Sequence, residues 1–367
     1  MTKKDDQKYL VIEEIDNIFR VSDILVDQDK NITLLDIREV CDFDELQKPT
    51  AKKSKIILAL NSNHATTVEK EITIERSYTH NKIDEGEIDQ LVFKTLWTFL
   101  DKYRNWSSKK MNVADLNIVL SEVEIKNTAL NSKNVLDPVG LKGENITFRI
   151  RGTLIPRKFL EHIKKLKNIS NNIKVVERLA LVSIFCSRGD FNVHTTPRNM
   201  EIFSVKENEI KYKKKFSWGT HSLINSVATL FSVKDKTAVK ILDKYFKKEV
   251  SKNIFEAIGT KINKNLETFY KNVRGITKKR KIDIFVNTPH HVYQKSLEEY
   301  SKSQYLDLSE IMKEKGFNVI MKSDNNLPYF KDIPESIVLA GADLFSTHYR
   351  KLNKMLRRRS KWLVPHT

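Results

Sequence analysis

The residues best suited to chemistry stand in one short run, His194-Thr-Thr-Pro-Arg-Asn199. The hydroxyls of Thr195 and Thr196 and the guanidinium of Arg198 could contact an anion, and the His194 imidazole could bind a metal. A backbone that grips phosphate usually needs glycine, because only glycine lets main-chain N–H groups approach closely. This run has no glycine, and its proline removes one N–H donor. It therefore offers anion-binding side chains without an anion-binding main chain.

Glycine is scarce throughout, with ten in 367 residues and no Gly-Gly pair. Gly140 and Gly143 nevertheless fall close together, beside Pro138, in the stretch 135–143. Proline fixes one φ and glycine permits positive φ, so this stretch is typical of a specific turn between two strands. His290-His291 is a second candidate for metal binding. It lacks a third ligand nearby in the sequence, so we expect no metal site there.

The C-terminal segment has the pattern of a basic amphipathic helix. Its apolar arc holds Phe345, Leu352, Met355, Leu356, Trp362 and Leu363, and its cations are Arg350, Lys351, Lys354, Arg357, Arg358 and Lys361, with Arg359 inside the arc. Such a helix is typical of a membrane-surface anchor, and each cation near an anionic leaflet contributes about 1 kcal/mol. Two alternatives stay open. The arc packs on the protein itself, or the arginine-rich run binds nucleic acid, which the scarcity of interleaved aromatic residues disfavours.

The chain carries 65 Lys and Arg against 47 Asp and Glu, for a formal net charge of +18. Such a balance raises the expectation of a nucleic-acid or anionic-membrane partner, but the lysines are spread along the whole chain. No run approaches the roughly 18 apolar residues of a membrane span, and the N-terminus shows no secretory signal. Cys41 and Cys186 lie far apart, which predicts a reducing compartment, no structural zinc and two small buried thiols.

Strands alternate with helices along the chain, which predicts an α/β architecture. We expect strands at 9–14, 18–26, 32–39, 55–60, 116–123, 146–154, 282–287 and 317–322, and hairpins at 69–76 and 191–216. We expect a strand and then a helix at 175–186, a loop running into a helix at 217–231, and helices at 84–103, 156–167, 234–248, 251–273, 292–315 and from 334. The helix at 84–103 is the clearest, because its apolar residues recur at helical spacing. Pro156 suits the opening of the next helix.

The run Asp137-Pro-Val-Gly-Leu-Lys-Gly143, followed by the strand at 146–154, resembles a stretch of the FtsA family, the bacterial actin homologue of cell division. In that family the stretch belongs to a small subdomain inserted in the first lobe. Further segments resemble the family in the expected order, at 174–183, 192–203, 216–225, 237–242, 282–287, 316–322 and 332–343. The resemblance implies an α/β fold of the actin-like (ribonuclease H-like) type, with two lobes.

The same resemblance implies a division of the chain into parts. We expect a first-lobe meander at 1–54, an inserted FtsA-type (SHS2-like) subdomain at 55–167 and a return to the first lobe at 168–190. The second lobe follows at 191–349 and the basic tail at 350–367. The tail continues from the last lobe helix without a visible linker, so packing of its apolar arc on the second lobe is the alternative to membrane binding.

The family binds ATP through glycine-bearing turns, and this chain departs from each of them. The first hairpin, at 13–18, has extra carboxylates and no glycine, the second is the run at 194–199, and the adenosine turn, at 287–291, has no glycine pair. The residues left at a degenerate nucleotide site are Glu13, Asp16, Thr195, Thr196, Arg198, Gly219 and Thr220. We therefore expect no ATPase activity and no cofactor, with bound ATP and Mg²⁺ as the alternative.

The resemblance thus implies a divergent FtsA-like scaffold of the division machinery (divisome), cytoplasmic and peripheral on the inner face of the membrane. Its expected partners are an FtsZ-like polymer, other division proteins and the anionic membrane surface, with self-association as a further possibility and nucleic acid disfavoured. The expected membrane-binding residues are Leu352, Met355, Leu356, Arg357, Arg358, Lys361, Trp362 and Leu363. The alternatives are an ATP-binding, polymerising actin homologue and a PilM-like adaptor of pilus assembly.

Overall fold

The computed structural model describes residues 6–15, 18–41, 45, 54–170, 172–186, 191–206, 209–219, 221–277, 282–286, 304–305, 308–321, 334–344 and 349–363. The chain forms two compact units. Unit 1 comprises Met1–Leu181 with Leu339–Thr367, and unit 2 comprises Val182–Val338. The chain leaves unit 1 within helix α3 (Arg178–Cys186) and returns to it within helix α9 (Glu335–Leu344). The five-part division expected from the sequence stays a prediction.

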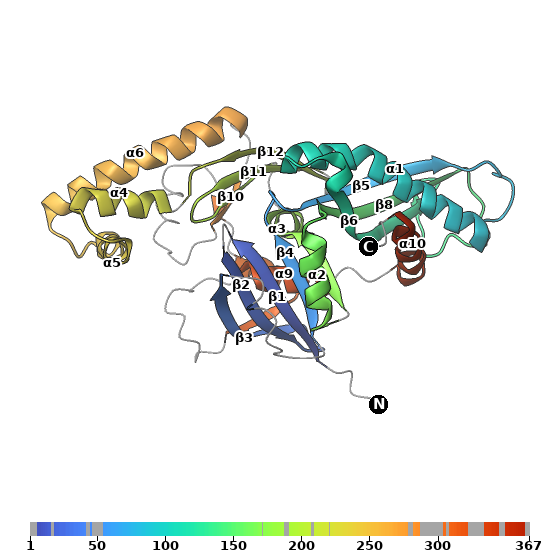
Figure 1. Ribbon diagram of the computed structural model, residues 1–367, viewed down its shortest axis with the longest axis horizontal. Coiled ribbons are helices and arrows are strands. Elements are labelled where there is room, and N and C mark those ends of the chain that lie inside the picture. The colour runs from blue at the N-terminus through green and yellow to red at the C-terminus, as the bar shows by residue number, and fades with distance from the viewer. Residues whose placement is uncertain are drawn as a thin grey trace. The chain divides into compact units, whose positions relative to one another are not determined.

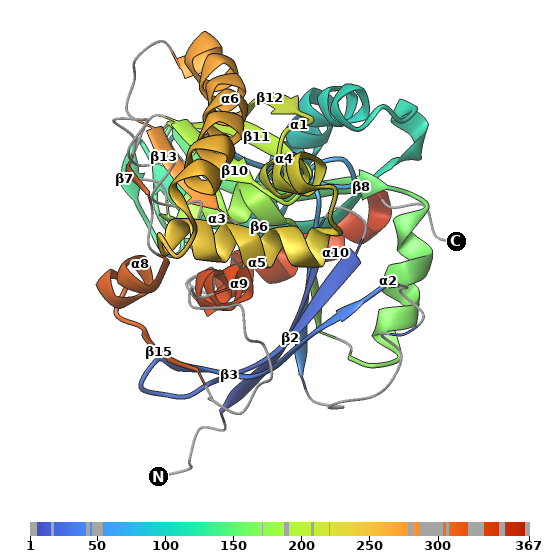
Figure 2. The same ribbon diagram turned by 90° about the vertical axis from the view of Figure 1, so that its left-hand side faces the viewer.

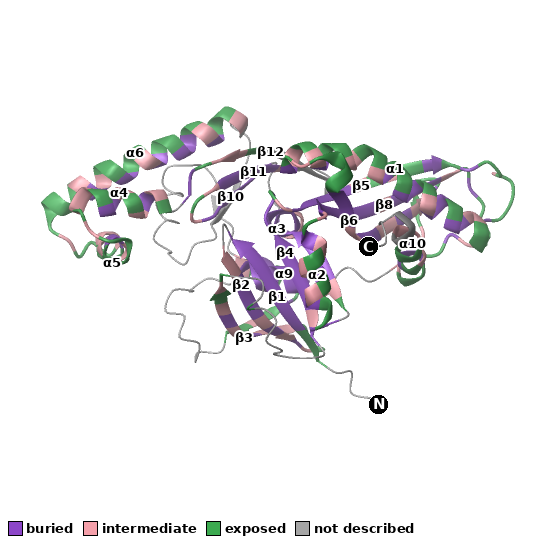
Figure 3. Ribbon diagram, in the orientation of Figure 1, coloured by how far each residue is buried: buried purple, intermediate pink, exposed green. Residues whose placement is uncertain are grey.

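The first sheet of unit 1 is built on an antiparallel meander. The strands that unit 1 contributes to it are β1 (Gln7–Ile15), β2 (Ile18–Val26), β3 (Asn31–Val40), β4 (Lys55–Leu60) and β9 (Ile173–Glu177). They lie in the order β3-β2-β1-β4-β9, and β4 and β9 run parallel to β1 (Figure 1). Every residue of β1 from Tyr9 onward is buried, as is every residue of β4 after Lys55 (Figure 3). Such near-continuous apolar strands are typical of a sheet covered on both faces.

A second, antiparallel sheet of unit 1 is inserted between β4 and β9. It contains β5 (Thr66–Glu75), β6 (Ile118–Leu130), β7 (Lys133–Asn134) and β8 (Asn145–Pro156), in the order β5-β8-β6-β7. Helix α1 (Glu85–Met111) packs on this sheet with an apolar face that includes Leu96 and Phe99, while its other face is exposed (Figure 3). The helix begins where the Asp84 carboxylate accepts the N–H of Glu87, and ends at Asn112 in the left-handed conformation.

Two shorter helices complete this part of unit 1. A 3-10 turn, η2 (Asp115–Asn117), leads from α1 into β6, and α2 (Phe159–Lys167) joins β8 to β9. Phe159, Ile163 and Leu166 of α2 pack with residues of β1 and β4 in one apolar core. The helix therefore covers the first sheet of the unit, as its apolar spacing predicts.

Unit 2 repeats the strand order of the first sheet. Its strands are β10 (Phe191–Thr195), β11 (Met200–Lys206), β12 (Glu209–Phe216), β13 (Ile282–Val286) and β14 (Gln304–Tyr305). They lie in the order β12-β11-β10-β13-β14, with the first three antiparallel and the last two parallel to β10. The two sheets thus share one pattern, in which β1 corresponds to β10 and β4 to β13.

Helices enclose the core of unit 2. They are α4 (His221–Phe231), α5 (Asp235–Phe246) and α6 (Lys252–Thr277), which lie together in Figure 2, with α8 (Leu308–Glu314) and the short strand β15 (Asn318–Met321) further along the chain. The ring of Trp218 packs against that of Phe269 of α6, with centroids 4.7 Å apart. This contact ties the longest helix of the unit to the segment that precedes α4.

The structure corrects several expected elements. The hairpin expected at 69–76 is a single strand, because β5 pairs with β8 along its whole length and Glu69 is neutralised by arginines of β8. Pro156 ends β8 rather than opening a helix, since it still pairs with Ile118. Residues 304–305 of the helix expected at 292–315 form a strand, and 292–303 lie outside the described residues. Cys41 is exposed, although Cys186 is buried as expected.

Candidate functional site

The turn after β10, in unit 2, is closed on itself. The N–H of Thr196 donates to the Asn199 carbonyl at 2.8 Å, and the N–H of Asn199 donates to Oγ1 of Thr196 at 3.0 Å. Pro197 between them has no N–H to give. Thr195 and Thr196 are buried, whereas Arg198 is exposed. These main-chain donors, which a phosphate hairpin would present to its ligand, are therefore engaged within the turn.

Gly219 packs directly on this turn. A Cβ at position 219 would lie 2.3 Å from the carbonyl oxygen of Pro197, so only glycine fits there. The N–H of His221, at the start of α4, donates to the same oxygen at 2.7 Å. A helix N-terminus can hold an anion, but here its leading N–H serves a protein carbonyl. The surviving glycine of this region is thus explained by packing.

His194 and the first hairpin also have protein partners. Nε2 of His194, which is buried, lies 2.6 Å from the Ser183 hydroxyl, and no group of three or more potential ligands for a metal is found among the described residues. Glu13 is buried opposite Arg20 in the β1–β2 ladder. Glu14 accepts the N–H of Asn61 at 2.9 Å. Asp16, Thr220 and the expected adenosine turn at 287–291 lie outside the described residues.

In unit 1 the turn at 137–143 joins β7 to β8 and packs against the segment that precedes α1. Gly140 has φ of +82°, and its N–H donates to the Ile83 carbonyl at 2.8 Å. Gly143 has no positive φ, contrary to the expectation; instead, a Cβ there would meet the Leu130 side chain at 2.6 Å. Pro138 lies within an Asx-type turn, in which the N–H of Val139 donates to the Asp137 carboxylate at 3.0 Å. The turn is thus fixed by packing as well as by dihedral angles.

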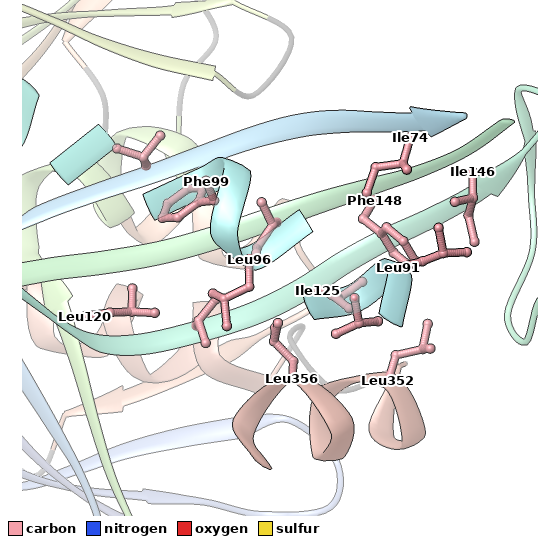
Figure 4. Packing of buried hydrophobic residues seen from close by; sticks show 14 of the residues in the cluster. Ile74, Leu91, Leu96, Phe99, Leu120, Ile125, Ile146, Phe148, Leu352 and Leu356 are labelled. Carbon is pink, nitrogen blue, oxygen red and sulfur yellow. The ribbon is translucent and has the colours of Figure 1, made fainter. Parts of the chain in front are cut away.

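The C-terminal helix α10 (Arg350–Leu363) packs on the inserted sheet. Leu352 and Leu356 are buried in the same apolar cluster as α1 and β6, where they point toward Ile125 and Leu91 (Figure 4). The alternative in which the apolar arc packs on the second lobe is therefore wrong, because the surface that matches it belongs to unit 1. The side chains of Lys361, Trp362 and Leu363 lie outside the described residues.

Polar contacts fix the register of α10. The side-chain amide of Asn353 accepts the N–H of Ile125 at 2.6 Å and donates to its carbonyl at 3.2 Å. Asp89 of α1 accepts from Arg358 at 2.9 Å and also pairs with Arg359. The hydrogen bond from Arg359, and to a smaller extent the one from Arg358, holds the pKa of Asp89 below its usual range. The docked position is thus specified by hydrogen bonds as well as by apolar burial.

A cavity of about 1380 Å³, lined by many charged residues, runs beside α10 in unit 1. Its walls come from β4, α1, β6, β9, α9 and α10. The charged residues that line it are Lys55, Glu85, Asp89, Glu122, Glu124, Lys174, Asp343, Arg350, Lys351, Lys354, Arg357 and Arg358. Arg350, Lys354 and Arg357 are exposed and have no ion pair in the part of the chain that the structure describes. The cavity therefore presents unpaired cations along one wall.

A chain of buried ion pairs forms the floor of this cavity. Lys174 of β9 lies 3.4 Å from both carboxylate oxygens of Glu124 in β6 and 3.2 Å from Asp343 in α9. Asp343 also pairs with Lys55 and accepts a hydrogen bond from Tyr9 at 3.1 Å. Burial opposes the charge of Asp343, but the two lysines outweigh it and hold its pKa below the usual range. The network ties the two sheets of unit 1 together.

Proteins similar to this chain are found among solved structures. No family model and no curated protein matches the sequence. A PilM–PilN type IV pilus biogenesis complex is 8% identical over 96% of this chain and 98% of that chain, with a TM-score of 0.46. The cytoplasmic domain of EpsL, from the type II secretion system of Vibrio cholerae, is 8% identical over 93% and 96%, with a TM-score of 0.38. A Bacteroides thetaiotaomicron protein with an actin-like ATPase fold is 11% identical over 92% and 96%, with a TM-score of 0.35.

These TM-scores are too low to support an argument about function. The fold class rests instead on the repeated sheets, since a meander followed by parallel strands occurs in both units with the same order. The chain has an actin-like fold of two lobes, as the sequence predicted. No helix among the described residues combines the length and the apolarity that a membrane span requires.

Several residues of this region were not among the site residues predicted from the sequence. Asp89 stands beside Ile88 on the apolar face of α1, and Asn353 stands between the apolar residues of α10. A polar residue on a buried helical face needs a partner, so each predicts a specific contact. The partners themselves, Ile125 and the arginines, lie too far away in the sequence to be read from it. For Glu122 and Lys174, no sequence motif predicts burial or an ion pair.

Proposed function

We propose that this protein is a non-enzymatic, actin-like adaptor that attaches a protein polymer to an anionic membrane surface. In its finer form the proposal is an FtsA-like scaffold of cell division, at the inner face of the membrane, with an FtsZ-like polymer as partner. An ATP-binding, polymerising protein and a PilM-like pilus-assembly adaptor are the alternatives. Gene neighbours distinguish the pilus branch from the division branch.

The observation that carries the proposal is the cationic face of α10. Arg350, Lys351, Lys354, Arg357 and Arg358 are exposed, and the helix contains no acidic residue. A cation near an anionic leaflet contributes about 1 kcal/mol, so a face of this kind supports attachment to anionic lipid. The closed turn at 196–199 supports the non-enzymatic part, because its N–H groups are engaged within the protein.

Sedimentation with vesicles tests the membrane part. The full-length double variant Lys354→Gln/Arg357→Gln removes two cations that have no ion pair in the described structure, so the docked helix keeps its contacts. We expect its affinity for vesicles of equal parts phosphatidylglycerol and phosphatidylcholine to fall by about 2 kcal/mol, roughly thirtyfold. The matched control, Lys261→Gln/Lys264→Gln on α6, removes the same charge elsewhere and should retain binding. Equal losses in both variants, or none in either, would contradict the proposal.

A further inference from the structure

The residues that a membrane anchor would insert are already in use in unit 1. Leu352 is 2% exposed and Leu356 is fully buried, both in the core beneath α10. Met355 packs against the same cluster. An apolar side chain cannot lie in this core and in a bilayer at once. Docking on unit 1 and insertion into lipid therefore exclude each other.

The docked helix also covers an open strand edge. Strand β6 pairs with β8 along its length, but β7 pairs only with Ala129 and Leu130 at its far end. Before that point, within the described residues, the second edge of β6 has no strand partner. The Asn353 amide occupies both the N–H and the carbonyl of Ile125 at this edge. An uncovered edge is a template for pairing with another chain, so α10 protects it.

Ion pairs add to the apolar burial that holds α10 on unit 1. Lys351 pairs with Glu85 at 2.9 Å and lies 3.5 Å from Asp137, and Arg358 pairs with Asp89 at 2.9 Å. Arg359 pairs with Asp89 as well and covers the Phe93 ring, 5.4 Å from its centroid. These are the cations that an anionic leaflet would attract. Lipid phosphates thus compete with the acidic residues of α1 and the adjoining turn for the same charges.

We propose that α10 is a latch: an anionic membrane surface draws the helix off unit 1, freeing its apolar face for insertion and uncovering the edge of β6 at Ile125. The inference rests on the proposed membrane attachment and adds its regulation. While the helix is docked, the apparent affinity for lipid is lowered in proportion to the undocked fraction. Weakening the dock without touching the tail must therefore strengthen lipid binding.

The variant Asp89→Asn tests the latch, because it weakens the hold on two arginines and leaves the tail unchanged. In vesicle sedimentation with the full chain we expect about a tenfold gain in affinity for the same phosphatidylglycerol mixture. Asp101→Asn, an equal change of charge at an exposed site of α1, should not move the affinity. Hydrogen exchange at the Ile125 amide gives a second measurement. It should accelerate when vesicles are added to the unaltered protein, and in Asp89→Asn even without vesicles.

The outcomes separate the latch from the proposed function. If Lys354→Gln/Arg357→Gln loses vesicle binding but Asp89→Asn gains none, and Ile125 stays protected on vesicles, the latch is wrong and membrane attachment stands. If the Lys354→Gln/Arg357→Gln variant binds as tightly as the unaltered chain, the attachment itself is wrong. A gain in Asp101→Asn equal to that in Asp89→Asn would reduce the effect to net charge and overturn the latch.

Discussion

The carboxyl of Glu122 lies near several charged side chains but has no hydrogen bond or ion pair in the described part of the chain. The residue lines the cavity of unit 1, and burial raises the pKa of its carboxyl to about 7, even though Lys174 and Arg357 act in the opposite direction. Its neighbour Glu124 behaves differently, because Lys174 and Lys126 outweigh burial and lower the pKa of Glu124. The pKa values of two cavity carboxyls in one strand are therefore shifted in opposite directions.

The raised pKa makes the stability of unit 1 depend on pH. Between the ordinary carboxyl value of 4.5 and about 7 the folded state binds more protons at Glu122 than the unfolded state, so this group lowers stability as pH rises. We expect Glu122→Gln to be more stable than the unaltered protein at pH above 7, by on the order of 2 kcal/mol, and the gain to vanish in mild acid. Urea unfolding across this range measures it. The exposed control Glu71→Gln should show no such trend; a gain for Glu122→Gln that persists below the ordinary value would contradict the assignment.

Among elements, the contact between α1 and the inserted sheet can be tested by a single substitution. A Cβ on Gly152 of β8 would lie 2.5 Å from the ring of Phe99, which is fully buried in α1. Overfilling such a contact costs about 1–3 kcal/mol, so we expect Gly152→Ala to lower the stability by that amount. Gly275→Ala is the control, because nothing lies within 4 Å of its Cβ and alanine favours a helix. Thermal unfolding decides; equal melting temperatures for the two variants would mean that α1 does not pack as described.

The elements also show what the sequence could predict. The helix at 84–103 was predictable from its apolar period of 3.6 residues, and the opening meander from strands rich in β-branched and aromatic residues. Strand β5 was not, since its Glu69 and Lys70 look like turn residues until the arginines of β8 are known. The site followed the same division. The amphipathic pattern of α10 was visible in the sequence, but its docking on β6 depends on Asn353 and Ile125, which are far apart in the chain.

At the scale of the whole molecule, the two units contain sheets with the same strand order but differ in their other elements. Unit 1 holds an inserted sheet, a network of buried ion pairs and the docked helix α10, whereas unit 2 holds the helices α4, α5 and α6. Removing one partner from a buried ionic set typically costs about 3–5 kcal/mol, so the network joining the sheets of unit 1 favours one arrangement of them. The functional features of the proposed adaptor are thus concentrated in unit 1.

Isothermal titration calorimetry with Mg²⁺-ATP tests the central claim most directly, namely that this actin-like frame no longer grips a triphosphate. The turn at 196–199 spends its N–H groups within the protein, and Gly219 packs against Pro197 rather than leaving room for a ligand. We predict no saturable heat when the full chain is titrated with nucleotide up to millimolar concentration. A Kd of about 1 mM is the weakest binding that the method resolves. Saturable binding with one nucleotide per chain and a micromolar Kd would contradict the account.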